Sequence, residues 1–208
     1  MTGLHYSDTL AGRVFSQQTN AVSIAGLAIP IFTGTSVGGG LPLWNPPNSN
    51  RNVELVSYDL VYASGTTAAT FDGVFLMAGQ LTAIGTATGC SVFTSAPPVN
   101  GLLLGGASSR VLSSNGGTVT VIAGTSTTAA AAPLTGAGFC GVARTLYSTN
   151  VEAATGTAHP TVTCTYTFNG TIIIPSGVLI YLAGIVASTS LYNITMIWKE
   201  IPIVPSQG

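Results

Sequence analysis

The sequence contains few of the side chains that most often carry out catalysis, and these are far apart. A G-x-S-x-G pattern at Gly34–Gly38 would make Ser36 the nucleophile of a hydrolase, on a sharp turn between a strand and a helix. The residues that follow, Gly39–Pro42, cannot begin that helix. The chain also has 26 glycines and 19 serines, so composition alone makes such a match common. We therefore do not expect a serine hydrolase.

The metal-ligating residue types are equally scattered. His5 lies near the start of the chain and His159 precedes a proline, so neither is placed to complete a triad. The cysteines Cys90, Cys140 and Cys164 show no C-x-x-C spacing, and no H-x-x-x-H pattern is present. We expect the cysteines to be small buried side chains in a protein made in a reducing compartment. The sequence predicts no metal site and no cofactor.

The sequence also contains no motif for phosphate binding or for sugar cleavage. The single lysine, Lys199, is not part of a phosphate-binding loop. Alternation along a strand places Glu54 and Asp59 on opposite faces, which disfavours this carboxylate pair, and the other acids cannot be paired from sequence. Four aromatic residues could hold a sugar ring, although core packing is their more common use: Trp44, Tyr58, Tyr62 and Trp198. We expect a protein that is not an enzyme.

Charge is unusually sparse. Five basic and six acidic residues make up 5% of the 208 residues, against about 25% in an average protein. A net charge of −1 provides no basic surface for nucleic acid or for an anionic membrane. The longest apolar run, Val178–Ala187, is half the length of a membrane span, and no secretory signal opens the chain. One explanation is a coat of Thr and Ser that keeps the surface wet. Because interface cores are depleted of charge, we favour the other, that partners cover much of the surface.

Strand patterns dominate the chain, whereas clear helical periodicity is missing. Residues 53–64 form the best candidate strand, and residues 71–81 are expected to return as its antiparallel partner. Residues 161–168 alternate strictly between threonine and larger apolar side chains. Residues 178–188 and 191–201 are expected to form a final hairpin.

About eight to ten strands with regularly spaced turns predict an all-β fold with less than about 10% helix. The expected architecture is an antiparallel two-sheet sandwich, jelly-roll-like, formed by residues 21–208. Residues 1–20 contain few large apolar side chains, and we expect them to be an N-terminal arm with little core of its own.

Two groups of residues are the candidate contact sites. The larger arm residues need a neighbouring subunit or shell to pack against, unless the arm is simply a frayed terminus. A strand face rich in threonine suits solvent or a partner. The residues are Leu4, Tyr6, Leu10, Arg13, Val14, Phe15, Thr161, Thr163, Thr165 and Thr167.

Three segments carry a resemblance to a known class of proteins: Leu43–Ser49, with an N-P-x-x-S turn, the late turn Pro175–Gly177, and the closing Ile197–Pro202. Together they resemble small β-rich capsid decoration, or cement, proteins of tailed bacteriophages. By layout the resemblance covers residues 41–202, and its motifs are short.

The resemblance implies a structural virion protein, assembled in the host cytoplasm, that binds the outside of an icosahedral phage capsid. Its partner would be the major capsid protein, clamped by non-covalent contacts, often by a homotrimer. The alternative is a phage receptor-binding or carbohydrate-binding jelly-roll domain, which would present exposed aromatic side chains in a groove. The resemblance implies no catalytic residues.

Overall fold

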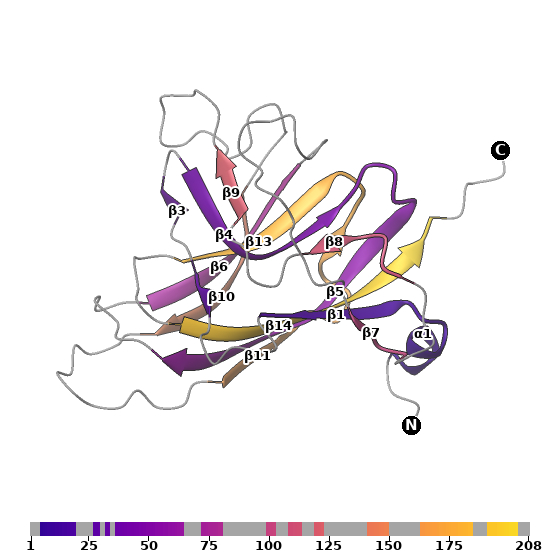
Figure 1. Ribbon diagram of the computed structural model, residues 1–208, viewed down its shortest axis with the longest axis horizontal. Helices are drawn as coiled ribbons and strands as arrows, with labels where there is room; N and C mark the ends of the chain where they lie inside the picture. Colours follow the sequence, from indigo (N-terminus) through magenta and orange to yellow (C-terminus); the bar gives the residue numbers. More distant parts are fainter. Residues whose placement is uncertain are drawn as a thin grey trace.

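The computed structural model describes residues 5–19, 27–29, 32–33, 36–64, 72–80, 99–102, 108–113, 119–122, 141–149, 163–184 and 191–203. Strands dominate these residues, and their one helix is the short α1 (Tyr6–Leu10) (Figure 1). This confirms the all-β prediction. The physical reason is the abundance of β-branched residues and the scarcity of strong helix formers such as Glu, Lys and Arg.

Two antiparallel sheets form the fold. The first has the spatial order β11 (Thr163–Thr167), β5 (Arg51–Ser64), β14 (Leu191–Pro202), β1 (Val14–Gln18), β7 (Val99–Asn100), with β12 (Ile173–Ile174) beside β5 and β2 (Leu27–Ala28) beside β14. The second has the order β10 (Gly141–Thr149), β6 (Asp72–Gln80), β13 (Val178–Gly184), β4 (Ser36–Asn45), β3 (Phe32–Thr33), with β8 (Leu112–Ser113) and β9 (Val119–Ile122) also pairing with β4.

The longer strands divide evenly between the sheets. The first contains β1, β5, β11 and β14, and the second contains β4, β6, β10 and β13. Along the chain, most connections therefore pass from one sheet to the other. Two antiparallel sheets connected in this way form a jelly-roll-like sandwich, as the sequence predicted.

This topology corrects two predicted strand pairings. β6 does not return beside β5: it pairs with β10 and β13 in the second sheet. β13 and β14 do not form a hairpin, because β13 pairs with β4 and β6 while β14 pairs with β1, β2 and β5. The chain therefore passes from one sheet to the other between β5 and β6, and again between β13 and β14.

The second half of the expected arm is built into the sandwich. β1 lies between β14 and β7 in the first sheet. Phe15 is 2% exposed, and its ring stacks on Trp198 with 6.0 Å between centroids. One apolar residue aimed between the sheets, together with a full ladder to β14, is enough to fix this segment. Residues 14–18 are therefore part of the domain and not an arm.

A β-bulge in β5 changes which side chains share a face. Ile197 pairs with Ser57, and the next residue, Trp198, pairs with Leu55, so Val56 is the extra residue. Leu55 and Tyr58 consequently both enter the core, where each is completely buried. The alternation predicted for 53–64 is broken at this point, since a bulge shifts the two-residue period by one.

The bulge also corrects the predicted separation of Glu54 and Asp59. Glu54 pairs with Lys199 and Asp59 pairs with Thr195, and these two β14 residues alternate with the buried ones. Both acids therefore lie on the side of the first sheet that points away from the second sheet, where Glu54 is largely buried beside Lys199.

Two of the segments that carry the sequence resemblance meet in the fold. The Asn45 Nδ2 donates to the carbonyl oxygens of Arg51 and Ile174, at 2.9 and 3.0 Å. The Gly177 N–H donates to the Asn45 carbonyl at 2.7 Å, and Gly177 has a φ of 84° that favours glycine. Asn45 is completely buried. The N-P-x-x-S turn and the late Pro-Ser-Gly turn are thus two halves of one structural clamp.

Candidate functional site

The broadest candidate site is the face of the first sheet that points away from the second sheet. Along β14, the buried residues Tyr192, Ile194, Met196 and Trp198 alternate with half-buried ones that point outward. The pairing register then aligns outward positions on the neighbouring strands. We call this surface the outer face, and its members are Ser16, Gln18, Asp59, Val61, Thr165, Thr167, Asn193, Thr195 and Ile197.

The outer face is weakly polar. One row across the sheet runs Gln18, Thr195, Asp59, Thr165, and it contains a single charge. The next row, through Ile197, adds an aliphatic side chain. Hydroxyl and methyl groups on a pleated surface can pack against a partner with little desolvation of charge. The surface is suited to extended contact and offers no nucleophile paired with a base.

The short helix α1 is joined to the first sheet by ion pairs. The Lys199 Nζ lies 2.5 Å from a Glu54 carboxylate oxygen and 3.3 Å from an Asp8 carboxylate oxygen. Burial lowers the pKa of Lys199, but hydrogen bonds to Glu54 and Asp8 and their negative charges outweigh this effect and raise the pKa above its ordinary value of 10.5. Asp8 lies on α1, so Lys199 ties the helix to strands β5 and β14.

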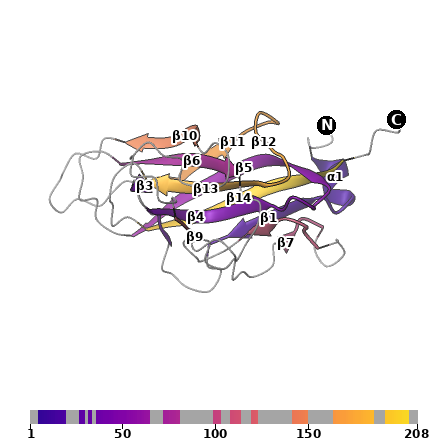
Figure 2. The same cartoon turned by 90° about the horizontal axis from the view of Figure 1, so that it is seen from above.

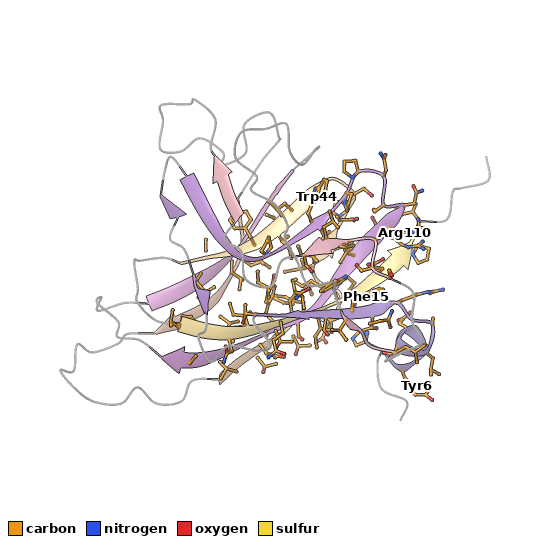
Figure 3. All side chains as sticks on the ribbon, viewed as in Figure 1. Tyr6, Phe15, Trp44 and Arg110 are labelled. Carbon is orange, nitrogen blue, oxygen red and sulfur yellow. The ribbon has the colours of Figure 1, made fainter. Side chains whose placement is uncertain are left out.

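Two predicted contact residues on α1 are accessible. Tyr6 is 56% exposed and Leu10 is 55% exposed. They are four residues apart and so share one face of the helix. Figure 3 shows Tyr6 pointing away from the sandwich at the α1 end of the molecule.

Arg13 lines the pocket described below, and the other predicted contact residues fall into three groups. Thr165 and Thr167 are exposed on the outer face, as their pattern predicted. Val14 is half-buried on β1, and Phe15 is a core residue, which corrects its assignment as a contact residue. Three assignments fall wholly or partly outside what the structure describes: Leu4 and Thr161 are not among its residues, and Thr163 is placed in β11 by its backbone alone.

The aromatic candidates for a sugar platform are mostly in the core. Trp44 is 6% exposed, and Tyr58 and Trp198 are completely buried. Burial also raises the pKa of the Tyr58 hydroxyl far above its ordinary value. The side chain of Tyr62 is outside the described set. Because they are buried, Trp44, Tyr58 and Trp198 are unable to stack on a glycan.

The pattern at Gly34–Gly38 also has a structural role where it is described. Ser36 begins β4 and pairs with β3 and β9, so it lies in a ladder and not on a strand-to-helix turn. Among the described residues, no group of three or more His, Cys, Asp or Glu side chains gathers as a metal site requires. No helix in the same part of the chain is long and apolar enough to cross a membrane.

A second candidate site brings together basic residues that are scattered in the sequence. Arg13, Arg51 and Arg110 line one pocket of about 270 Å³, together with Glu200. These residues come from the start of β1, the start of β5, the loop before β8 and the end of β14. No spacing in the sequence connects them, so sequence reasoning missed the site.

Comparisons with protein-family models, with curated proteins and with solved structures find no match for this chain.

Proposed function

We propose that this protein is a structural virion component that binds the outside of an icosahedral phage capsid and stabilises it by non-covalent contact with major capsid subunits. The observation that carries the proposal is the outer face, a surface on β1, β14, β5 and β11 whose members are mostly hydroxyl, amide and aliphatic side chains, with Asp59 as their one charge. Such a surface suits burial against a partner, since interface cores are depleted of charged residues.

The architecture supports the proposal by analogy. Jelly rolls are used by viral capsid proteins, although also by lectins and cupins, so the fold alone does not choose among them. Three of the four aromatic residues that could favour the lectin-type alternative are buried. The short segments that resemble cement proteins point in the same direction as the outer face.

The proposed mechanism is stabilisation by mass action. A protein that binds the assembled shell and not its loose subunits shifts the equilibrium toward the shell. Each copy needs only modest affinity, because many identical sites contribute. Contact through the outer face would depend on buried area, at about 25 cal/mol per Å², and only weakly on salt.

The test is a titration of the protein onto heads of the encoding phage that lack it. We expect the affinity at about 0.05 M salt and about 1 M salt, where Debye lengths are roughly 14 and 3 Å, to agree within tenfold. Heads carrying the protein should also withstand higher temperature than heads without it. Equal thermal stability of the two kinds of head would refute the proposal.

Matched variants locate the contact. Thr165→Arg combined with Thr167→Arg places two long cations on the outer face, and binding to heads should weaken more than tenfold. Asn48→Arg adds a cation on an exposed turn away from this face and should leave binding unchanged. Both variants should keep the parent melting temperature within a few degrees, because all three positions are exposed. Equal binding by the two variants would remove the outer face from the contact.

The proposed capsid-binding form of the protein is a homotrimer. A trimer is the state that the resemblance to cement proteins implies, and closed symmetry is the usual outcome for identical subunits that associate. Sedimentation equilibrium at micromolar concentration should therefore give three times the monomer mass of 20.9 kDa. A single species of monomer mass would contradict this state.

A further inference from the structure

The pocket at the α1 end of the sandwich concentrates positive charge in a chain that is otherwise poor in it. Three of the five basic residues, Arg13, Arg51 and Arg110, line this space. Phe15 contributes an apolar wall, and Figure 3 shows it with Arg110 toward the same end of the molecule. The pocket is small compared with the roughly 300–1,000 Å³ typical of drug-sized ligands.

Glu200 is the one acid among the described residues that line the pocket, and its carboxylate already accepts hydrogen bonds. Glu200 is 4% exposed, and its carboxylate accepts hydrogen bonds from the Ser109 Oγ at 2.6 Å and the Arg110 backbone N–H at 3.1 Å. These donors are neutral groups of the loop before β8. Glu200 therefore positions that loop, and the side chain of Arg110 is left without an ion-pair partner among the described residues.

The other two arginines are also weakly compensated. Arg13 lies 3.8 Å from Asp8, a long contact, and Asp8 is closer to Lys199 at 3.3 Å. Arg51 forms no ion pair with any described residue. The lining thus carries three positive charges against one negative charge.

Like charges around one pocket repel one another unless an anion joins them. Guanidinium groups are planar forks of N–H donors that match carboxylate and phosphate oxygens in pairs. We infer that this pocket binds an oxoanion group, a carboxylate or a phosphate, carried by a small molecule or by an acidic side chain of another protein. The inference does not depend on the proposed capsid function.

The first experiment titrates the full chain with inorganic phosphate, and separately with citrate, at constant ionic strength set by sodium chloride. Binding is followed by the NMR signals of the arginine Nε–H groups. Arg51→Gln and Arg110→Gln should each lower the affinity at least tenfold. Arg144→Gln changes the net charge equally, and the backbone of Arg144 lies in β10 of the second sheet, so it is the matched control.

Glu200→Gln separates binding from simple structural support. A glutamine oxygen can still accept the two hydrogen bonds, while the negative charge disappears from the pocket. We expect this variant to bind phosphate several-fold more tightly, an increase that a purely structural role for Glu200 would not produce. An unchanged or weaker affinity in a folded Glu200→Gln protein would contradict the electrostatic basis of the site.

A second experiment distinguishes the source of the anion. An acetylated and amidated Gly-Glu-Gly peptide presents one side-chain carboxylate, and Gly-Gln-Gly is its neutral control. Shifts with the glutamate peptide that are lost in Arg110→Gln indicate an acidic side chain, and shifts only with phosphate or citrate indicate a free anion. Either result supports an oxoanion pocket. If no probe binds, or if Arg144→Gln weakens binding as much as Arg51→Gln and Arg110→Gln do, the inference is overturned.

Discussion

Replacing Asn45 by alanine removes the clamp between the N-P-x-x-S turn and the late Pro-Ser-Gly turn. Asn45 is completely buried and donates to the carbonyl oxygens of Arg51 and Ile174. The Arg51 carbonyl keeps hydroxyl contacts at 3.3 Å from Ser49 and Ser176, so that loss costs about 1 kcal/mol. The Ile174 carbonyl loses this buried donor, which costs about 1–3 kcal/mol. The free energy of unfolding should therefore fall by about 2–4 kcal/mol.

The assay is thermal and urea denaturation of the variant beside the parent. For a domain of this size, such a loss lowers the melting temperature by about 5–15 °C. Asn48→Ala makes the same side-chain change three residues away, at an exposed turn position, and should cost less than about 0.5 kcal/mol. Indistinguishable unfolding curves for the two variants would refute the clamp.

Three further predictions concern the first sheet. Phe15→Ala should lower the free energy of unfolding by about 3–5 kcal/mol, because Phe15 is a core residue; a loss below about 1 kcal/mol in urea denaturation would restore the arm interpretation. Lys199→Met should cost about 1–3 kcal/mol at neutral pH, since Glu54 and Asp8 lose their cation. The pKa of Lys199 is raised in the folded state, so its contribution to stability is fully present below the unfolded value of 10.5 and is lost as the pH rises through the folded value. The difference in unfolding free energy between variant and parent should therefore shrink above about pH 10.5. A constant difference up to about pH 12 would argue against this ion pair. Tyr58→Phe should leave stability unchanged or raise it by about 1 kcal/mol, because the buried hydroxyl has no hydrogen-bond partner among the described residues; a loss above 1 kcal/mol on thermal unfolding would reveal a partner.

Local patterns in the sequence predicted the faces of individual strands well. Thr165 and Thr167 are exposed while Phe168 is buried, as strict alternation requires. The prediction failed at Val56, where one extra residue shifts the period of β5. A bulge depends on the partner strand, here β14, and leaves no mark in the alternation of its own strand.

Strand pairing was less accessible from the sequence. A turn rich in Gly, Pro and Asn reverses the chain equally well within a sheet or across a sandwich, so β5 and β6 were wrongly paired. The partner of β1 is β14, which begins at residue 191. No local pattern connects segments so distant, and the core role of Phe15 was missed for the same reason.

The arginine pocket was inaccessible for a related reason. Arg13, Arg51 and Arg110 belong to three segments that only the finished topology brings together. Counting charges over the whole chain gave an almost neutral total and concealed a local excess. A sum over the sequence does not predict a field at one end of the molecule.

The position of β14 has a consequence for how the chain acquires its structure. β14 lies between β5 and β1, yet it follows every other described strand in the sequence. During synthesis, the edges of β5 and β1 that pair with β14 therefore stay unpaired until residues 191–202 have left the ribosome. Pairings of such high sequence separation form slowly, and open strand edges are templates for aggregation. A chain interrupted before residue 191 would lack the central strand of its first sheet and would leave the facing edges of β5 and β1 open.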